Sequence, residues 1–206
     1  MGDTEKSQPL YAFDAAYAQQ YGVLCGVDEA GRGPLCGPVC VAAVILDPAV
    51  PIAGLNDSKK LTEKKREALF PQIVEHAVSY KIVMVGPEII DEINILQATM
   101  LGMCEAIEGL STVPALALID GNRCPQTAVQ TLAVVKGDAN SASIAAASIL
   151  AKVSRDRYMT ELSEKFPQYH LEKHKGYPTA EHYALLDQYG IEAFYRKSFL
   201  KKRGYV

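Results

Sequence analysis

Two adjacent carboxylates, Asp28 and Glu29, end an apolar run that has the composition of a strand. A loop of small residues follows at once and carries Arg32 between Gly31 and Gly33. Neighbouring side chains on a regular strand point to opposite faces, so both carboxylates reach one site only if the strand stops or twists there. The glycines permit such a bend and let backbone amides approach a ligand closely. Hard anionic ligands beside a donor-rich loop suit a divalent cation bound next to a phosphodiester.

Two further aspartates stand at the ends of predicted core elements. Asp120 closes the apolar segment 115–119, and Asp138 follows the strand-like segment 128–135. Ligand sites in α/β sheets gather at strand ends, and a buried carboxylate is costly unless it is paired or metal-bound. If these two residues meet the first pair, each like-charged pair 4 Å apart repels by about 1 kcal/mol in water and about 4 kcal/mol at an effective dielectric of 20. A counter-cation is then required, and oxygen ligands without His or Cys favour Mg²⁺ or Mn²⁺.

Each of these residues also has a more ordinary interpretation. Asp138 precedes a helix, where aspartate is a common N-cap, Asp120 suits a turn, and Glu29 is acceptable as a solvated strand-end residue. Arg32 between two glycines is compatible with a simple turn, because the segment lacks the Lys-Ser/Thr ending of the common phosphate-binding loop. Spacing alone does not establish that the carboxylates converge. Asp28, which lies among apolar and small residues, is the hardest to explain otherwise.

The elements that must position these residues alternate between strands and helices. The apolar patterns predict strands over residues 23–29, 39–46, 79–85, 115–119 and 128–135. They predict a helical turn at Pro87 and helices over residues 61–78, 95–110 and 180–189, together with a long helix that Asn140 or Ser141 caps and that runs to about Lys165. Residues 144–151 of the long helix are apolar almost all round, which indicates burial. The order predicts an α/β fold in which helices cover a mixed sheet, with the first two strands antiparallel.

The composition restricts the class of protein. A chain of 206 residues fits one domain, or one domain with a small appendage, and 49% hydrophobic with 22% charged residues is ordinary for a globular enzyme. The net charge of -3 excludes a generally basic nucleic-acid binder, so contacts with nucleic acid must come from local patches or bound metal. Five cysteines without a CxxC pair favour reduced thiols over a disulfide framework or a zinc site. Without a signal segment or a membrane-spanning run, a cytoplasmic protein that has no membrane partner is expected.

Six segments in order resemble the type 2 ribonuclease H family, and within it the bacterial ribonucleases HII. They are residues 26–34 (GVDEAGRGP), 57–61 (DSKKL), 119–121 (IDG), 135–138 (VKGD), 146–156 (AASILAKVSRD) and 174–179 (HKGYPT). The resemblance implies an RNase H-like fold with a five-stranded mixed sheet flanked by helices. It divides the chain into a tail and lead-in helix (1–20), a catalytic domain (21–166) and a C-terminal helical extension (167–206) that completes the substrate site.

The same resemblance implies an activity. It implies endonucleolytic hydrolysis of the RNA strand of RNA–DNA hybrids, and nicking on the 5′ side of single ribonucleotides embedded in duplex DNA. The products carry 3′-hydroxyl and 5′-phosphate ends, and the reaction uses two metal ions, Mn²⁺ or Mg²⁺. The nucleic acid is the implied partner, and monomer is the default oligomeric state. The rivals are a nuclease or strand-transfer protein of related fold, which would also cut DNA, and a module that binds hybrids without cutting them.

Roles for single residues follow from the resemblance by position. The metal-binding, catalytic carboxylates are Asp28, Glu29, Asp120 and Asp138. The residues that contact the 2′-hydroxyl and the neighbouring phosphate are Gly31, Arg32 and Gly33. Tyr177 stacks on the sugar after the ribonucleotide, where a 2′-hydroxyl would obstruct it. The 2′-hydroxyl alone distinguishes RNA from DNA at one nucleotide, and the backbone of a glycine loop can approach it closely.

The remaining candidates are weaker. Lys59, Lys60 and Lys175 suit phosphate contacts, with solvated surface lysines as the alternative, and Tyr177 without the family pattern suits an ordinary core or surface position. Ser148 and Lys152 share a helix face and either support the site or bond backbone groups. Other expectations are a structural ion-pair region at Arg155 and Asp156, and exposed, non-catalytic histidines at 170 and 174. The C-terminus carries a basic Lys-Lys-Arg segment but no clear sliding-clamp motif.

Overall fold

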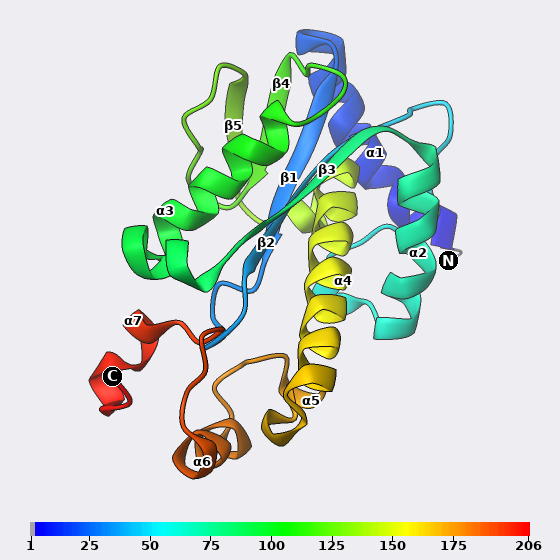
Figure 1. Cartoon of the computed structure of the whole chain (residues 1–206). Coiled ribbons are helices and arrows are strands. Elements are labelled where there is room, and N and C mark those ends of the chain that lie inside the picture. Colours follow the sequence, from blue (N-terminus) through cyan, green and yellow to red (C-terminus); the bar gives the residue numbers. More distant parts are fainter. Residues whose placement is uncertain (1–2) are drawn as a thin grey trace.

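A five-stranded mixed sheet forms the centre of the computed structural model, which describes the backbone of residues 3–206 and the side chains from residue 7 onward (Figure 1). The strands are β1 (Leu24–Ala30), β2 (Val39–Leu46), β3 (Ala77–Val85), β4 (Leu116–Asp120) and β5 (Gln130–Val134). Their spatial order is β3-β2-β1-β4-β5, with β1–β2 and β2–β3 antiparallel and β1–β4 and β4–β5 parallel. All five predicted strands, and the antiparallel pairing of the first two, are confirmed.

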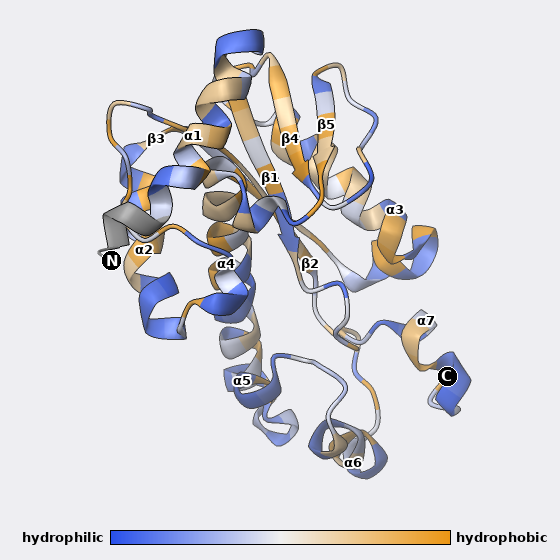
Figure 2. Ribbon diagram, turned by 180° about the vertical axis from the view of Figure 1, so that it is seen from behind, coloured by the Kyte–Doolittle hydropathy of each residue, from blue (hydrophilic) through white to orange (hydrophobic). Residues whose placement is uncertain are grey.

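Helices cover both faces of the sheet. The helices are α1 (Asp3–Tyr21), α2 (Glu63–His76), α3 (Pro87–Glu108), α4 (Ala142–Lys165), α5 (Leu171–His174), α6 (Ala180–Tyr189) and α7 (Lys197–Leu200). Figures 1 and 2 show α1, α2 and α4 on one face and α3 on the other. Strand β2 explains this division, because residues 40, 42 and 44 pack towards α4 while residues 41, 43 and 45 pack towards α3.

Helix α4 is the buried helix that the sequence predicts. Residues 144–151 are all buried, and Ser141 caps the helix by accepting a hydrogen bond of 3.2 Å from the Ile144 amide. Helix and strand touch backbone to backbone, since a Cβ on Gly26 of β1 would lie 2.1 Å from the Ser143 carbonyl carbon. Glycine at this position is therefore what lets α4 lie directly on the strand that carries Asp28.

Three boundaries differ from the sequence prediction. Helix α1 extends from Asp3 to Tyr21, where a tail with a short helix was expected, and residues 1–2 of that tail lie outside the described part. The turn at Pro87 and the helix 95–110 form one element, α3, which is interrupted at Asn94 by φ 69° and ψ 164°. The short helices α5 and α7 were not predicted, because four residues carry no readable periodicity.

The C-terminal segment has a small core of its own. Tyr169, Leu186, Tyr195 and Leu200 bury their side chains there, together with Leu35 from the loop that follows β1. In Figure 1 this segment lies at the end of α4, below the sheet. The division at residues 20 and 166 stays a prediction, but the shared cluster ties the loop after β1 to the C-terminal segment.

Two predictions from composition can be compared with the structure. All five cysteines are free thiols, as expected. Within residues 3–206, no helix has the length and apolarity that crossing a membrane demands.

Candidate metal and nucleic-acid site

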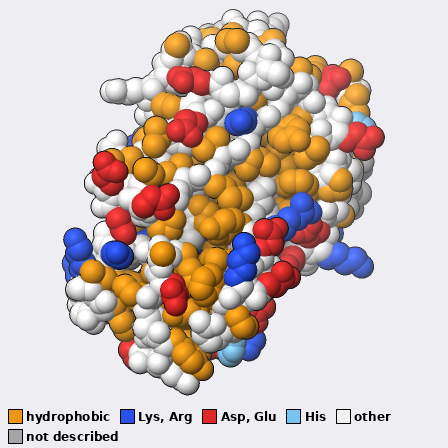
Figure 3. All heavy atoms as spheres, in the orientation of Figure 1, with side chains coloured by type: hydrophobic (Ala, Val, Ile, Leu, Met, Phe, Trp, Pro, Cys, Tyr) orange, Lys and Arg blue, Asp and Glu red, His pale blue; other side chains and the backbone are white. Residues whose placement is uncertain are grey.

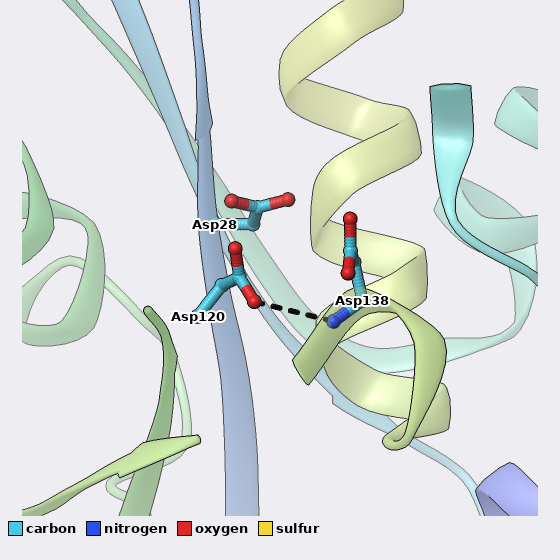
Figure 4. Close-up of side chains that lie close together, drawn as sticks. All are labelled: Asp28, Asp120 and Asp138. Carbon is cyan, nitrogen blue, oxygen red and sulfur yellow. Dashed lines mark hydrogen bonds between the residues drawn. The ribbon is translucent and has the colours of Figure 1, made fainter. Parts of the chain in front are cut away.

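Three carboxylates from distant parts of the chain meet at one end of the sheet. Asp28 lies near the end of β1, Asp120 ends β4, and Asp138 lies in the 3-10 turn Gly137–Ala139 that follows β5. One oxygen atom from each lies within 4.8 Å of the others (Figure 4). Because β1 and β4 are parallel neighbours with Val27 opposite Ile119, the next residue of each strand reaches the same edge. The convergence that spacing alone left open is present for these three aspartates.

Hydrogen bonds fix the three carboxylates. Asp28 Oδ1 accepts a 2.7 Å bond from the Glu29 amide. Asp120 Oδ1 accepts bonds of 2.7 Å from the Gly137 amide and 3.3 Å from the Asp138 amide, the latter drawn in Figure 4. These bonds hold the turn after β5 against the end of β4. Asp138 is therefore not the cap of α4, since Ser141 has that role, and the N-cap interpretation of Asp138 is wrong.

The electrostatics of the three aspartates favour a cation. Burial raises the pKa of Asp28 well above its usual value, and the negative charges of Glu29 and Asp120 raise it further. Burial, Asp120 and Asp57 also raise the pKa of Asp138, while the ammonium of Lys59 opposes the rise. Like charges this close cost energy in the ionised state unless a counter-charge is present. The donor atoms in this group are all carboxylate oxygens, which fits Mg²⁺ or Mn²⁺ better than zinc.

Glu29 lies outside this group of three. Strand β1 continues through Ala30, so the pleat directs Glu29 and Asp28 to opposite faces. The Glu29 carboxylate forms an ion pair of 3.4 Å with Arg32. Burial raises the pKa of Glu29, the Arg32 charge lowers it and the Asp120 charge raises it. The negative charge of the aspartate group therefore still acts on Glu29. Its role as a metal ligand stays a prediction.

The glycine-arginine loop and Tyr177 form one surface beside these carboxylates. Gly31 has φ 92°, and a Cβ there would lie 1.9 Å from Arg155 Nε, so only glycine fits. A Cβ on Gly33 would lie 3.7 Å from the Tyr177 ring, which places that ring directly against the loop. Tyr177 is 40% exposed, so its ring is available to a ligand. The structure thus brings together two motifs that lie far apart in the sequence.

Comparison with known proteins settles the family. The family model Ribonuclease HII matches residues 25–202. A ribonuclease HII from Vibrio parahaemolyticus is 57% identical over 183 residues, which cover 89% of this chain and 87% of that protein. The chain belongs to the ribonuclease HII family. It is therefore a nuclease, a hydrolase of phosphodiester bonds, as the six motifs predicted.

Solved structures agree with this family and with its fold. Ribonuclease H2 from Pyrococcus horikoshii matches with a TM-score of 0.72 and 27% identity, over 88% of this chain and 96% of that chain. A ribonuclease HII from Archaeoglobus fulgidus, solved in a complex with PCNA, matches with a TM-score of 0.72 and 28% identity, over 86% and 94%. The predicted RNase H-like fold is confirmed.

The three candidate lysines of this ribonuclease HII family member have different environments. Lys59 Nζ lies 3.5 Å from Asp138 Oδ2, at the edge of the carboxylate group. Lys60 Nζ lies 3.9 Å from Asp57. Lys175 Nζ donates a 2.9 Å bond to Thr160 of α4. Acidic and basic side chains are interspersed on the face that Figure 3 shows, in keeping with local contacts rather than one basic stripe.

Ser148 and Lys152, which share a face of α4, have different contacts. Ser148 Oγ forms a buried 2.7 Å hydrogen bond with Ser58 Oγ, and a bond from Ser148 lowers the pKa of Asp28 against the effect of burial. Ser148 therefore supports the site, which was one of its two interpretations. Lys152 forms an ion pair of 2.8 Å with Asp156.

Two expectations about the C-terminal half are wrong at one residue each. The expected ion-pair region at Arg155 and Asp156 holds for Asp156, which pairs with Lys152, but Arg155 forms no ion pair within the described residues; it is fully buried and donates to the carbonyls of Pro38, Cys36 and Lys175. His174 is buried rather than exposed and stacks on His182 at 4.1 Å between ring centroids. His170 is half-buried and pairs with Glu181 at 2.9 Å.

One functional candidate, Arg196, gave no signal in the sequence. It lies between an aromatic residue and a lysine near the C-terminus, yet its side chain is fully buried under the loop that follows β1. Only the tertiary fold reveals this contact, because the two segments lie more than 150 residues apart.

Proposed function

We propose that this chain is an endoribonuclease that hydrolyses the RNA strand of RNA–DNA hybrids and nicks on the 5′ side of single ribonucleotides in duplex DNA. The products are 3′-hydroxyl and 5′-phosphate ends. Membership of the ribonuclease HII family supports activity on hybrids. The observation that carries the finer proposal is the convergence of Asp28, Asp120 and Asp138 beside the glycine-arginine loop.

The carboxylates are the proposed metal ligands. Asp28, Glu29, Asp120 and Asp138 would hold two divalent cations, Mn²⁺ or Mg²⁺, which supply charge neutralisation and an activated water for phosphoryl transfer. Asp120 also orients the turn of Asp138 through its two amide bonds, which preserves the spacing of the carboxylates. Lys59, beside Asp138, places a positive charge at the edge where the nucleic-acid backbone would arrive.

The loop and Tyr177 are the proposed substrate readers. Gly31, Arg32 and Gly33 would contact the ribose 2′-hydroxyl and its phosphate through closely approaching backbone groups. Tyr177 would stack on the next sugar and accept only a deoxyribose there. Its ring lies against Gly33, so both parts of an RNA–DNA junction would be read at once. Lys60 and Lys175 are the remaining proposed phosphate contacts.

The decisive experiment uses a DNA duplex that carries one ribonucleotide. The protein is incubated with this duplex, an all-DNA duplex and a long RNA–DNA hybrid, each with Mn²⁺, Mg²⁺ or chelator. The proposal expects a metal-dependent nick on the 5′ side of the ribonucleotide, cutting of the hybrid and an intact DNA control. Cutting of the all-DNA duplex would favour a general nuclease. Binding without any cut, by protein shown to be folded, would favour a hybrid-binding module.

A further inference from the structure

Two arginine side chains lie fully buried beneath the loop that follows β1. Arg196, between α6 and α7, and Arg155, on α4, are the two largest fully buried side chains of the described residues. Arg196 donates from Nη2 to the Gly31 carbonyl at 2.7 Å and from Nη1 to the carbonyls of Arg32 at 3.0 Å and Pro34 at 2.9 Å. Its Nε donates to Gly37 at 2.9 Å. The guanidinium of Arg196 thus donates hydrogen bonds to four backbone carbonyls of one loop.

Arg155 continues this pattern along the same loop. Its Nη2 donates to the Cys36 carbonyl at 3.3 Å and its Nε to the Pro38 carbonyl at 3.1 Å. Its Nη1 donates to the Lys175 carbonyl at 3.0 Å, and its guanidinium carbon lies 5.8 Å from the centre of the Tyr177 ring. Arg155 therefore connects the loop to the segment that carries Tyr177.

Neither positive charge forms an ion pair with a described carboxylate; Asp156 acts on Arg155, and Asp91 on Arg196, only from beyond ion-pair distance. No ion pair of the described residues includes Arg155 or Arg196. Burial and the charge of Arg155 lower the pKa of Arg196 to about 10, so Arg196 remains charged at neutral pH. Burial also lowers the pKa of Arg155. Burying a charge without a counter-charge is costly, and carbonyl dipoles compensate only part of that cost. A nearby anion would therefore stabilise these two buried charges.

The direction of the peptide groups shows where that anion would lie. All peptide bonds of the described chain are trans, so a carbonyl that points inward leaves the amide N–H of the next residue pointing outward. The inward carbonyls of Gly31 and Arg32 therefore turn the amides of Arg32 and Gly33 to the surface. Within the described chain neither amide has a hydrogen-bond acceptor. Consecutive free amides above buried positive charge form a typical anion-binding concavity.

We propose that Arg196 and Arg155 are positioning residues that present the Arg32 and Gly33 amides to a phosphate of the ribonucleotide-containing strand. The substrate phosphate is the counter-anion of the two buried guanidinium groups. This inference rests on the proposed function, because it assigns the phosphate to the substrate of that site. Neither arginine touches the reacting atoms, and both act through the loop.

If Arg196 had a purely structural role, the charge of one substrate phosphate would not matter to it. Substrates in which a single phosphate is replaced by a neutral linkage test this. Methylphosphonate linkages replace, one at a time, the phosphates flanking the single ribonucleotide. Affinity is measured by fluorescence anisotropy in chelator, which prevents cleavage. The proteins are wild type, Arg196→Met and, as matched control, Arg157→Met. Arg157 lies on α4 and pairs with Glu67 at the surface.

We expect one methylphosphonate to weaken binding by wild type about 10-fold, the effect of losing a charge-assisted hydrogen bond. Arg196→Met should lose less than about 3-fold at that position, because the charge that the phosphate neutralised is absent. Arg157→Met should behave as wild type. Equal losses in wild type and Arg196→Met at every position would overturn the inference, since a structural defect lowers affinity without regard to the charge of one phosphate.

Two further measurements keep the outcome unambiguous. If thermal unfolding shows that Arg196→Met does not fold, Arg196→Gln replaces it. Glutamine keeps a polar amide but not the charge, so one methylphosphonate should weaken its binding less than it weakens binding by wild type, and an equal weakening would overturn the inference. Wild type is also compared on ribonucleotide-bearing and all-DNA duplexes. Absence of any preference there would refute the proposed function and this inference with it, whereas a preference with additive losses refutes the inference alone.

Discussion

Two clusters of like charge lie near the loop that follows β1, and they differ in how their charges are compensated. The acidic cluster of Asp28, Asp120 and Asp138 has Lys59 at its edge and pKa values raised by burial and mutual repulsion. The basic pair of Arg155 and Arg196 forms no ion pair within the described chain, but each of its guanidinium nitrogens donates to a backbone carbonyl.

The two clusters therefore differ in the kind of ligand that would balance their charge. Carboxylates accept hydrogen bonds but repel one another, so the acidic cluster is complete only when a cation arrives. Guanidinium groups can use carbonyls as partners, so the basic pair organises the loop before any ligand binds. On the proposed function, metal would balance the charge of the acidic cluster, and the basic pair would pre-form a surface whose anion comes with the substrate.

The largest expected effect comes from removing one carboxylate of the acidic cluster. Asp28→Asn removes one charge and one metal-ligand oxygen, and we expect cleavage of the single-ribonucleotide duplex to fall on the order of 10³-fold or more. Far-ultraviolet circular dichroism should show an unchanged fold. Turnover near that of wild type would remove Asp28 from the proposed ligands.

A matched control for Asp28→Asn is Asp47→Asn. Asp47 follows β2 at the opposite end of the sheet, where its carboxylate accepts a 2.8 Å bond from the Ala49 amide. The same chemical change at this turn should leave cleavage within about twofold of wild type, because surface substitutions away from special features have small effects.

The metal-free protein tests the charge balance directly. The folded-state pKa of Asp28 is raised above its unfolded value. Its contribution to folding is therefore fully present below the usual pKa of aspartate, near 4, and is lost as pH rises through the folded-state pKa. An asparagine side chain cannot ionise, so in chelator at pH 7 Asp28→Asn should be more stable than wild type by about 1 to 4 kcal/mol, the range for a like-charged pair 4 Å apart.

Thermal unfolding from pH 7 to pH 4 checks this sign. The advantage of Asp28→Asn should shrink as pH falls, since wild-type Asp28 becomes protonated. Adding Mn²⁺ at pH 7 should raise the melting temperature of wild type and reduce the difference, because ligand binding stabilises the folded state. A variant that is less stable than wild type in chelator at pH 7 would contradict the repulsion.

The acidic cluster was more predictable from sequence than the basic pair, and the reason is physical. Asp28 and Asp120 end apolar runs, and neighbouring parallel strands bring such ends together, so local pattern plus sheet geometry suffices. Asp138 also follows a strand-like run, but helix capping was an alternative local interpretation, and the family motifs supported its place at the site. Glu29 marks the limit: the strand continues past it, and the pattern alone did not show that its carboxylate pairs with Arg32.

Arg196 shows why the rest could not be predicted. An arginine near a basic C-terminus has the local pattern of a solvated residue, and its four carbonyl partners lie at the other end of the chain. Burial of His174 is hidden for a different reason, because it comes from stacking on the nearby His182, which no periodic pattern indicates. Long-range polar contacts to backbone carry no residue-type signal, whereas apolar periodicity does.

A smaller effect tests the substrate-facing surface between the two clusters. Tyr177→Ala removes the exposed ring beside Gly33, and we expect cutting at a single embedded ribonucleotide to fall about 10-fold, the effect of losing one stacking contact. Cutting of a long RNA–DNA hybrid should fall less, because many positions there do not present a junction. Tyr177→Phe keeps the ring and should retain most of the activity on both substrates. Equal losses for Tyr177→Ala on both substrates would mean that the ring does not read the junction.

The smallest expected effect concerns the scaffold behind Tyr177. His182 Nδ1 lies 2.9 Å from the Tyr177 carbonyl oxygen and Nε2 lies 2.9 Å from the Tyr195 hydroxyl, and burial lowers the pKa of His182 to about 4. The unfolded chain therefore binds this proton first, so the stability that neutral His182 contributes is present above pH 6.5 and is lost as pH falls towards 4. His182→Gln cannot titrate, and its melting temperature should decline less than that of wild type between pH 7 and 4.5, by roughly 2 to 8 °C. Comparing the two pH slopes cancels any constant loss of hydrogen bonds in the variant, and parallel slopes would show that His182 does not set the acid sensitivity of this region.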